Sequence, residues 1–202
     1  MKHYATLPPW LKPSARTDIL HLDLKVRPAI RTELAIPVSR DVVRIWMRRL
    51  GWYTAIDHDD FLVASRSSTL ALMILAIDRD DSPHTFRLGR ALGYPTCCCR
   101  AAASVGDQNL DSWALALSQR GFIGRFRLID PTHYRDGNAL ICHIPCSTFC
   151  QASLQMAEAT LAALRRAIPP LPVFSASTSR YFNFSGQIGS ELPLPYARRR
   201  RR

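Results

Sequence analysis

The chain has 202 residues, 47% of them hydrophobic, which is enough for one sizeable core. Its longest apolar run, Leu70 to Ile77, is shorter than the roughly 18 residues that a membrane helix needs, and residues 1–10 lack the apolar segment and cleavage site of a signal peptide. We therefore expect a cytoplasmic protein with no membrane partner.

The formal net charge is +11, and basic proteins often bind nucleic acid because phosphate contacts are mainly electrostatic. Arg198 to Arg202 supply a large part of this charge from one tail, and a basic terminal run is usually solvated. Weak nucleic-acid binding through this arginine tail is one hypothesis, in which the protein is a basic accessory factor.

The first half of the chain begins with several prolines and little periodicity. Residues 1–35 therefore predict an irregular N-terminal arm, with one extended piece from Ile19 to Val26. Ser39 is placed to cap a short amphipathic helix that ends at Gly51. Phe61 to Ala64 predict a strand, whereas Leu70 to Ile77 fit either a buried strand or a buried helix.

The second half is richer in helix signals, with serine, threonine, proline and glycine at the expected ends. In chain order we predict a helix from Ser82-Pro83 to Gly93, a helix capped by Thr96, a helix from Asp111 to Gln119, a strand from Phe122 to Ile129, a strand from Ala139 to Ile144, a helix from about Phe149 to Ala167 capped by Ser147 or Thr148, and a strand at Arg180 to Phe184.

Short strands and helices without regular alternation predict an α+β fold. We expect a single compact domain of several helices with a small sheet over residues 36–185. The arm of residues 1–35 packs on this domain, and residues 186–202 form a flexible basic tail.

The six cysteines lie in two groups, Cys97 to Cys99 and Cys142 to Cys150, each near a predicted helix start. They are too few and too clustered to be a disulfide scaffold. A helix N-terminus carries partial positive charge and free N–H groups, so it stabilises a thiolate. This pattern points to metal or thiol chemistry.

Thiolates with an imidazole suit zinc or an iron–sulfur cluster better than magnesium or calcium. If the two helix starts converge, the expected ligands are Cys97, Cys98, His143, Cys146 and Cys150. No standard ligand spacing is matched, and adjacent cysteines are expected to diverge on a helix. The leading hypothesis is a cysteine-rich metal or iron–sulfur protein, with enzymatic activity left open.

Metal-free thiol chemistry is the alternative, as in redox sensing or sulfur transfer. Cys97 or Cys98 would then attack, and Cys146 or Cys150 would resolve the intermediate. Some of the six cysteines should instead be small buried hydrophobic residues. Cys142 and one member of Cys97 to Cys99 are the first candidates.

Two sequence elements carry a resemblance: Gly93-Tyr94-Pro95-Thr96-Cys97-Cys98, and His143-Ile144-Pro145-Cys146 followed by Ser147-Thr148-Phe149-Cys150. Together they resemble an uncharacterised prokaryotic family with a Gly-Tyr-Pro-x-Cys-Cys element and a later His-x-Pro-Cys-x-x-x-Cys element. The likeness covers about residues 82–167. It implies no established activity, but it implies that the two elements belong to one site.

Overall fold

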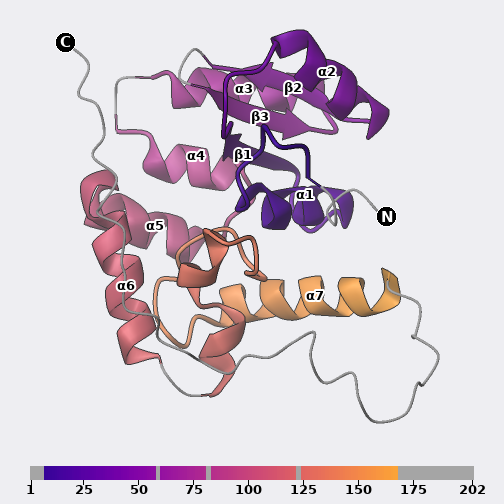
Figure 1. Cartoon of the computed structure of the whole chain (residues 1–202). Helices are drawn as coiled ribbons and strands as arrows, with labels where there is room; N and C mark the ends of the chain where they lie inside the picture. The colour runs from indigo at the N-terminus through magenta and orange to yellow at the C-terminus, as the bar shows by residue number, and fades with distance from the viewer. Residues whose placement is uncertain (1–6, 58–59, 81–82, 122–123, 168–202) are drawn as a thin grey trace, which may run out of the picture. The chain divides into compact units, whose positions relative to one another are not determined.

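The computed structural model describes residues 7–57, 60–80, 83–121 and 124–167 (Figure 1). All of these belong to one compact unit, Met1–Ile168. The helices and strands are α1 (Ala15–Asp23), β1 (Ala29–Glu33), α2 (Arg40–Arg49), β2 (Tyr53–Ile56), β3 (Phe61–Ser65), α3 (Ser68–Asp78), α4 (Thr85–Ala91), α5 (Thr96–Val105), α6 (Leu110–Arg120) and α7 (Gln151–Ala167), with short 3₁₀ helices at Asp107–Asn109, Gly124–Leu128 and Pro131–Tyr134. The predicted α+β class is confirmed. The predicted strand at Arg180 to Phe184 and the tail of residues 186–202 lie outside the described residues.

In the described residues, three strands form one antiparallel sheet in the order β1-β3-β2. Because side chains alternate along a strand, β1 and β3 each contribute to two cores. Ile30, Leu62 and Ala64 face one core, and Ala29 and Val63 face the other. The small sheet is therefore covered on both faces.

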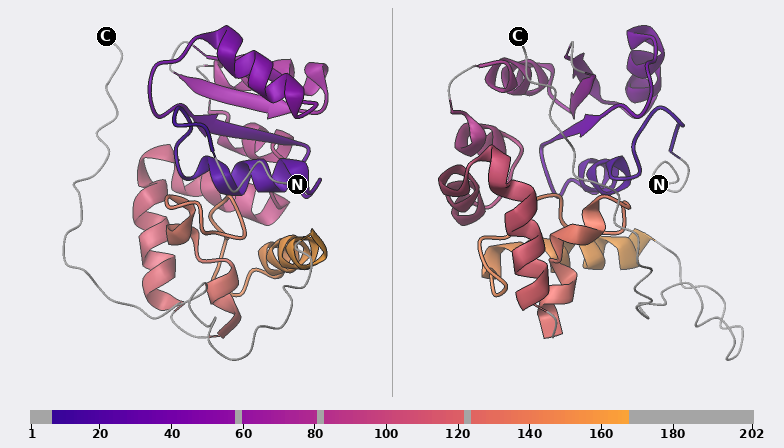
Figure 2. Two further views of the ribbon diagram at one scale, coloured as in Figure 1. Left: turned by 45° about the vertical axis from the view of Figure 1, so that its right-hand side comes forward. Right: turned by 60° about the vertical axis from the view of Figure 1, so that its left-hand side comes forward.

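Helices α1 to α4 cover the two faces of the sheet (Figure 2). α1 and α2 pack on one face of the sheet, where Ile19 and Met47 are fully buried. α3 and α4 pack on the other, with Ile74 and Leu92 in the second core. These apolar contacts hold the first half of the chain together.

The N-terminal arm differs from the prediction, because residues 15–23 form the helix α1 and residues 29–33 form the strand β1. The predicted extended piece from Ile19 to Val26 is wrong. α1 is buried on nearly all sides, including Asp18 and His21. A helix buried all round shows no one-sided apolar stripe, so the sequence carries no helical period there.

The capping residues predicted for α2 are confirmed. Ser39 caps α2 by accepting a hydrogen bond from the Asp41 backbone N–H, and Gly51 follows the helix with φ 78°, as predicted. The segment Leu70 to Ile77 is part of the helix α3. α4 begins at Thr85, later than predicted, and Ser82 lies outside the described residues.

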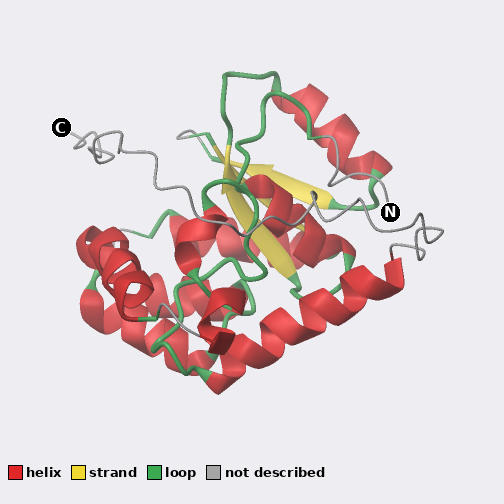
Figure 3. Ribbon diagram, turned by 60° about the horizontal axis from the view of Figure 1, so that its bottom comes forward, coloured by secondary structure: helices red, strands yellow, loops and turns green. Residues whose placement is uncertain are grey.

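The second half of the unit is mainly helical and carries its own core (Figure 3). α5, α6 and α7 surround buried residues that include Leu117, Phe126, Ile141 and Leu154. The helix predicted at Asp111 to Gln119 is confirmed as α6. No helix in the described residues is long and apolar enough to cross a membrane.

Two strands predicted in this half are wrong. Residues 124–128 form a 3₁₀ helix, and residues 122–123 lie outside the described part. Residues 139–144 form a buried loop without strand pairing. The Thr17 hydroxyl donates to the Ala139 carbonyl, and His21 Nε2 lies 2.8 Å from the Leu140 carbonyl. Side chains of α1 thus satisfy carbonyl groups that a neighbouring strand would otherwise satisfy.

Candidate metal centre

Four thiols from two distant parts of the chain form one group. The Sγ atoms of Cys97, Cys98, Cys146 and Cys150 all lie within 4.8 Å of one another. The first pair belongs to α5, and the second pair lies in the segment that leads into α7. The two predicted cysteine elements therefore converge, and this four-cysteine group can hold a metal ion.

The first pair is positioned by the start of α5. Pro95 occupies the N-cap with φ −57° and ψ 136°, and Thr96 is the first helical residue. The predicted cap by Thr96 is wrong, since no side chain caps this helix. Cys97 and Cys98 lie in the first turn, as predicted, where backbone N–H groups have no partner within the helix. The partial positive charge of the helix N-terminus therefore lies beside these two side chains.

The second pair is positioned by the start of α7. The Cys150 carbonyl accepts the first helical hydrogen bond, from the Leu154 N–H at 3.0 Å, so Cys150 is itself the N-cap. The helix starts at Gln151, and the predicted cap by Ser147 or Thr148 is wrong. A turn closed by the Cys150 N–H and the Ser147 carbonyl, 3.3 Å apart, precedes it.

The separations between the sulfurs are short and similar. Cys97 Sγ lies 3.9 Å from Cys98 Sγ and 3.7 Å from Cys150 Sγ, and Cys98 Sγ lies 3.5 Å from Cys150 Sγ. Adjacent Cys97 and Cys98 therefore do not diverge as expected from a regular helix. Thiolates bound to one tetrahedral zinc at about 2.3 Å lie about 3.8 Å apart. The three separations are close to that value.

The thiols differ in acidity. Burial opposes ionisation of Cys150, but hydrogen bonds from the Ser153 hydroxyl and backbone N–H, together with Cys146 and Cys98, lower its pKa to about 7. Burial, with the neighbouring Cys150, raises the pKa of Cys146 to about 11 and that of Cys98 further. Of these three thiols, Cys150 is therefore the first to lose its proton.

Ser153, on the first turn of α7, links this group to His143. Its Oγ lies 3.2 Å from Cys150 Sγ and 3.3 Å from Cys98 Sγ. His143 Nε2 lies 2.9 Å from the same Oγ. The predicted ligand His143 is thus not among the four clustered donors and contacts them through Ser153. Ser153 was not predicted from the sequence, although its position three residues after Cys150 places both on one helical face.

Burial and the charge of Arg27 lower the pKa of His143 to about 3, so its imidazole is neutral. The ring centroid lies 5.2 Å from that of Tyr94, and Nδ1 is buried without a hydrogen-bond partner. Packing on Tyr94 and the bond to Ser153 therefore fix the orientation of this ring.

The two remaining cysteines lie outside the group. Cys99 is buried, and its thiol donates to the Tyr94 carbonyl at 3.6 Å. Cys142 is buried beside His21. Burial raises the pKa of both thiols. The prediction that Cys142 and one member of Cys97 to Cys99 are buried core residues is confirmed.

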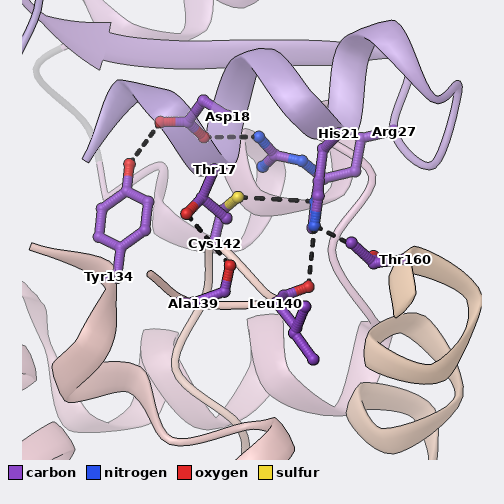
Figure 4. Close-up of polar contacts among 9 residues, drawn as sticks. All are labelled: Thr17, Asp18, His21, Arg27, Tyr134, Ala139, Leu140, Cys142 and Thr160. Atoms are coloured by element: carbon purple, nitrogen blue, oxygen red, sulfur yellow. Dashed lines mark hydrogen bonds and ion pairs between the residues drawn. The ribbon is translucent and has the colours of Figure 1, made fainter. Parts of the chain in front are cut away.

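A buried polar network surrounds α1 and Cys142, the residue before His143 (Figure 4). Arg27 and Asp18 form an ion pair at 2.7 Å with neither side chain exposed, and the Tyr134 hydroxyl donates to Asp18 at 2.5 Å. The Cys142 thiol lies 3.5 Å from His21 Nδ1. These contacts join α1 to the loop before α7. Nothing in the local sequence pattern indicates them.

The four-cysteine group is partly accessible to solvent. Cys97 is exposed, whereas Cys98 and Cys150 are buried. Phe149, next to Cys150 in the chain, is 79% exposed. Cys146 is intermediate in exposure, so solvent reaches the group at Cys97 and in part at Cys146.

Comparisons with known proteins found no match: no family model, curated protein or solved structure matches this chain. Functional inference therefore rests on the geometry of the site.

Proposed function

We propose that the four-cysteine group binds a single metal ion in tetrahedral coordination, and that zinc is this ion. Three sulfur separations, of 3.5, 3.7 and 3.9 Å, carry the proposal, because they are close to the edge length of about 3.8 Å for thiolates in a tetrahedron around one zinc. The fourth sulfur, that of Cys146, lies within 4.8 Å of the others. Thiolates from two helix starts are also the soft donors that zinc prefers.

An iron–sulfur cluster is the less favoured occupant. In a four-iron cluster each cysteine binds a different iron, so the cysteine sulfurs lie farther apart than sulfurs that share one ion. Cys97, Cys98 and Cys150 would have to move apart to hold such a cluster. A single ion requires no such movement.

The proposed role of this ion is structural. Four protein thiolates complete a tetrahedral shell and leave no open position for a substrate, which is typical of structural zinc sites. The ion joins the start of α5 to the start of α7. It would also stabilise residues 139–150, which contain no helix or strand.

Elemental analysis of protein purified without oxygen tests the proposal, with Cys146→Ser compared with Cys99→Ser. Cys99 lies in the same turn of α5 as two of the proposed ligands but outside the group. We expect about one zinc per wild-type chain, retention in Cys99→Ser and loss in Cys146→Ser. Iron with acid-labile sulfide would instead support a cluster.

A metal-free thiol protein is the second candidate, favoured by the lowered pKa of Cys150. The Cys150 thiolate would attack a disulfide substrate, form a mixed disulfide and release one substrate thiolate. Exposed Cys97, as thiolate, would then attack Cys150 Sγ, releasing the second substrate thiolate and leaving a Cys97–Cys150 disulfide. These roles reverse those predicted from the sequence.

Mass spectrometry after treatment with a small disulfide distinguishes the two candidates. The thiol mechanism predicts metal-free purified protein and a reversible Cys97–Cys150 disulfide, lost in Cys150→Ser. Stoichiometric zinc that protects all four thiols from alkylation would contradict it.

A further inference from the structure

We propose that Ser153 and His143 form a hydrogen-bond relay that positions the Cys150 thiolate for metal binding. Both are positioning residues rather than ligands. The inference rests on the proposed metal centre and adds to it the groups that orient and tune one ligand. The structure supports it through three contacts within 3.3 Å of a single hydroxyl oxygen, Ser153 Oγ.

The count of protons assigns a direction to the relay. Ser153 has one hydroxyl proton, and it donates to Cys150 Sγ. Its oxygen must then accept from His143, so the imidazole carries its proton on Nε2. Nδ1 is left as the bare nitrogen, which agrees with its lack of a partner. The relay therefore runs from His143 through Ser153 to Cys150.

Burial makes the relay rigid. Ser153 is fully buried and His143 is 8% exposed, so neither has water as an alternative partner. Tyr94 packs against the imidazole ring of His143. The Arg27 guanidinium lies over the ring of Tyr94, 4.9 Å from its centroid. Asp18 forms a buried ion pair with Arg27, Arg27 contacts Tyr94, and Tyr94 packs against His143.

The relay has a chemical consequence at the metal. A hydrogen bond withdraws electron density from a thiolate and fixes its lone pairs, so it tunes the metal–sulfur bond. Loss of such a partner typically weakens metal binding about 10- to 100-fold. Ser153 Oγ also lies 3.3 Å from Cys98 Sγ, but its one proton is directed at Cys150, so the relay acts on the Cys150 thiolate.

Cobalt(II) is the probe for the test, because its thiolate complexes absorb through sulfur-to-metal charge transfer. We expect Ser153→Ala to bind cobalt about 10- to 100-fold more weakly and to shift this absorption to longer wavelength, since the thiolate becomes a better electron donor. A merely structural change would not move the band. Thr160→Val is the matched control, because it removes another buried hydroxyl of α7 that contacts no thiol of the group.

Variants of His143 test the relay itself. Gln can place an amide N–H near the position of Nε2, so His143→Gln should retain the wild-type band, whereas His143→Leu should behave like Ser153→Ala. The double variant Ser153→Ala/His143→Leu should bind cobalt no more weakly than Ser153→Ala alone, because the two residues act in series.

The outcomes separate the two proposals. A wild-type chain that binds no cobalt overturns both the metal centre and the relay. Normal cobalt binding with an unchanged affinity and band in Ser153→Ala overturns the relay alone. If His143→Leu does not fold, the comparison of Ser153→Ala with Thr160→Val still shows whether the Ser153 hydroxyl affects cobalt binding.

Discussion

Cys97 and Cys150 contribute to the same four-cysteine group from different surroundings. Cys150 is buried and hydrogen-bonded to Ser153, whereas Cys97 is exposed and contacts other thiols. Water can take the place of an exposed ligand, but it cannot easily enter a buried position. The two ligands should therefore differ in how far the metal depends on them.

We predict that Cys150→Ser lowers zinc affinity more than Cys97→Ser, by a factor of about ten or more. Competition with a chromophoric chelator measures both affinities. Cys99→Ser, outside the group, serves as the control and should bind as the wild type does. A larger loss in Cys97→Ser would show that the exposed thiol holds the ion more firmly than the buried one.

Two buried histidines couple stability to pH. Burial, followed by the charge of Arg27, lowers the pKa of both His21 and His143 to about 3. Their ordinary value is about 6.5, so between pH 6.5 and 3 the unfolded chain binds protons that the folded chain does not. Stability contributed by the neutral imidazoles is present above pH 6.5 and lost as the pH falls.

We predict that the metal-free protein loses up to about 1.4 kcal/mol of unfolding free energy per pH unit for each of these histidines. Urea unfolding of chelator-treated protein between pH 7 and 4.5 measures the slope. His21→Gln should reduce the slope, whereas His133→Gln, outside the buried network, should retain it. A wild-type stability that does not change over this range would contradict the prediction.

At the scale of elements, α4 and α5 approach each other at Gly89. A Cβ built there would lie 2.8 Å from Cys99 Sγ and 3.4 Å from a ring carbon of Tyr94. Cys99 is buried and bonded to the Tyr94 carbonyl, so it has little room to move. This close contact positions the first turn of α5, which carries two of the proposed ligands.

We predict that Gly89→Ala destabilises the protein by about 1 to 2 kcal/mol, because the clash outweighs the better helix propensity of alanine. Adding Cys99→Ala removes the clashing sulfur, so the double variant should be more stable than the sum of the single effects implies. Chemical denaturation of the wild type, the two single variants and the double variant measures the coupling between Gly89 and Cys99. Strict additivity would mean that Gly89 and Cys99 do not interact.

Local signals predicted the elements whose ends are set by neighbouring residues. Ser39 and Gly51 delimit α2 because capping depends on groups a few residues apart. The same reasoning failed for α1 and for residues 139–144, where tertiary contacts replace local ones. A buried helix has no polar face, and a loop can satisfy its carbonyl groups with side chains from far along the chain.

At the scale of the whole molecule, the arginine tail lies outside the described residues, so nucleic-acid binding stays a prediction. If it occurs, affinity for duplex DNA should fall steeply with salt, and deletion of Arg198 to Arg202 should reduce the slope of log affinity against log salt by about 0.9 for each lost phosphate contact. Fluorescence anisotropy at several salt concentrations measures this. Binding that is unchanged by the deletion would exclude the tail.

The sequence alone determined which residue types were available for chemistry: it singled out the cysteines now found in one group and placed Cys97 and Cys98 in the first turn of a helix. These are local properties of composition and spacing. Only the tertiary structure decided that the two elements meet, that His143 contacts Ser153 rather than the thiols, and that Cys99 and Cys142 lie outside the group. Ser153 and Cys98 are 55 residues apart in the chain, and contacts over such separations depend on how helices pack, which no local pattern specifies.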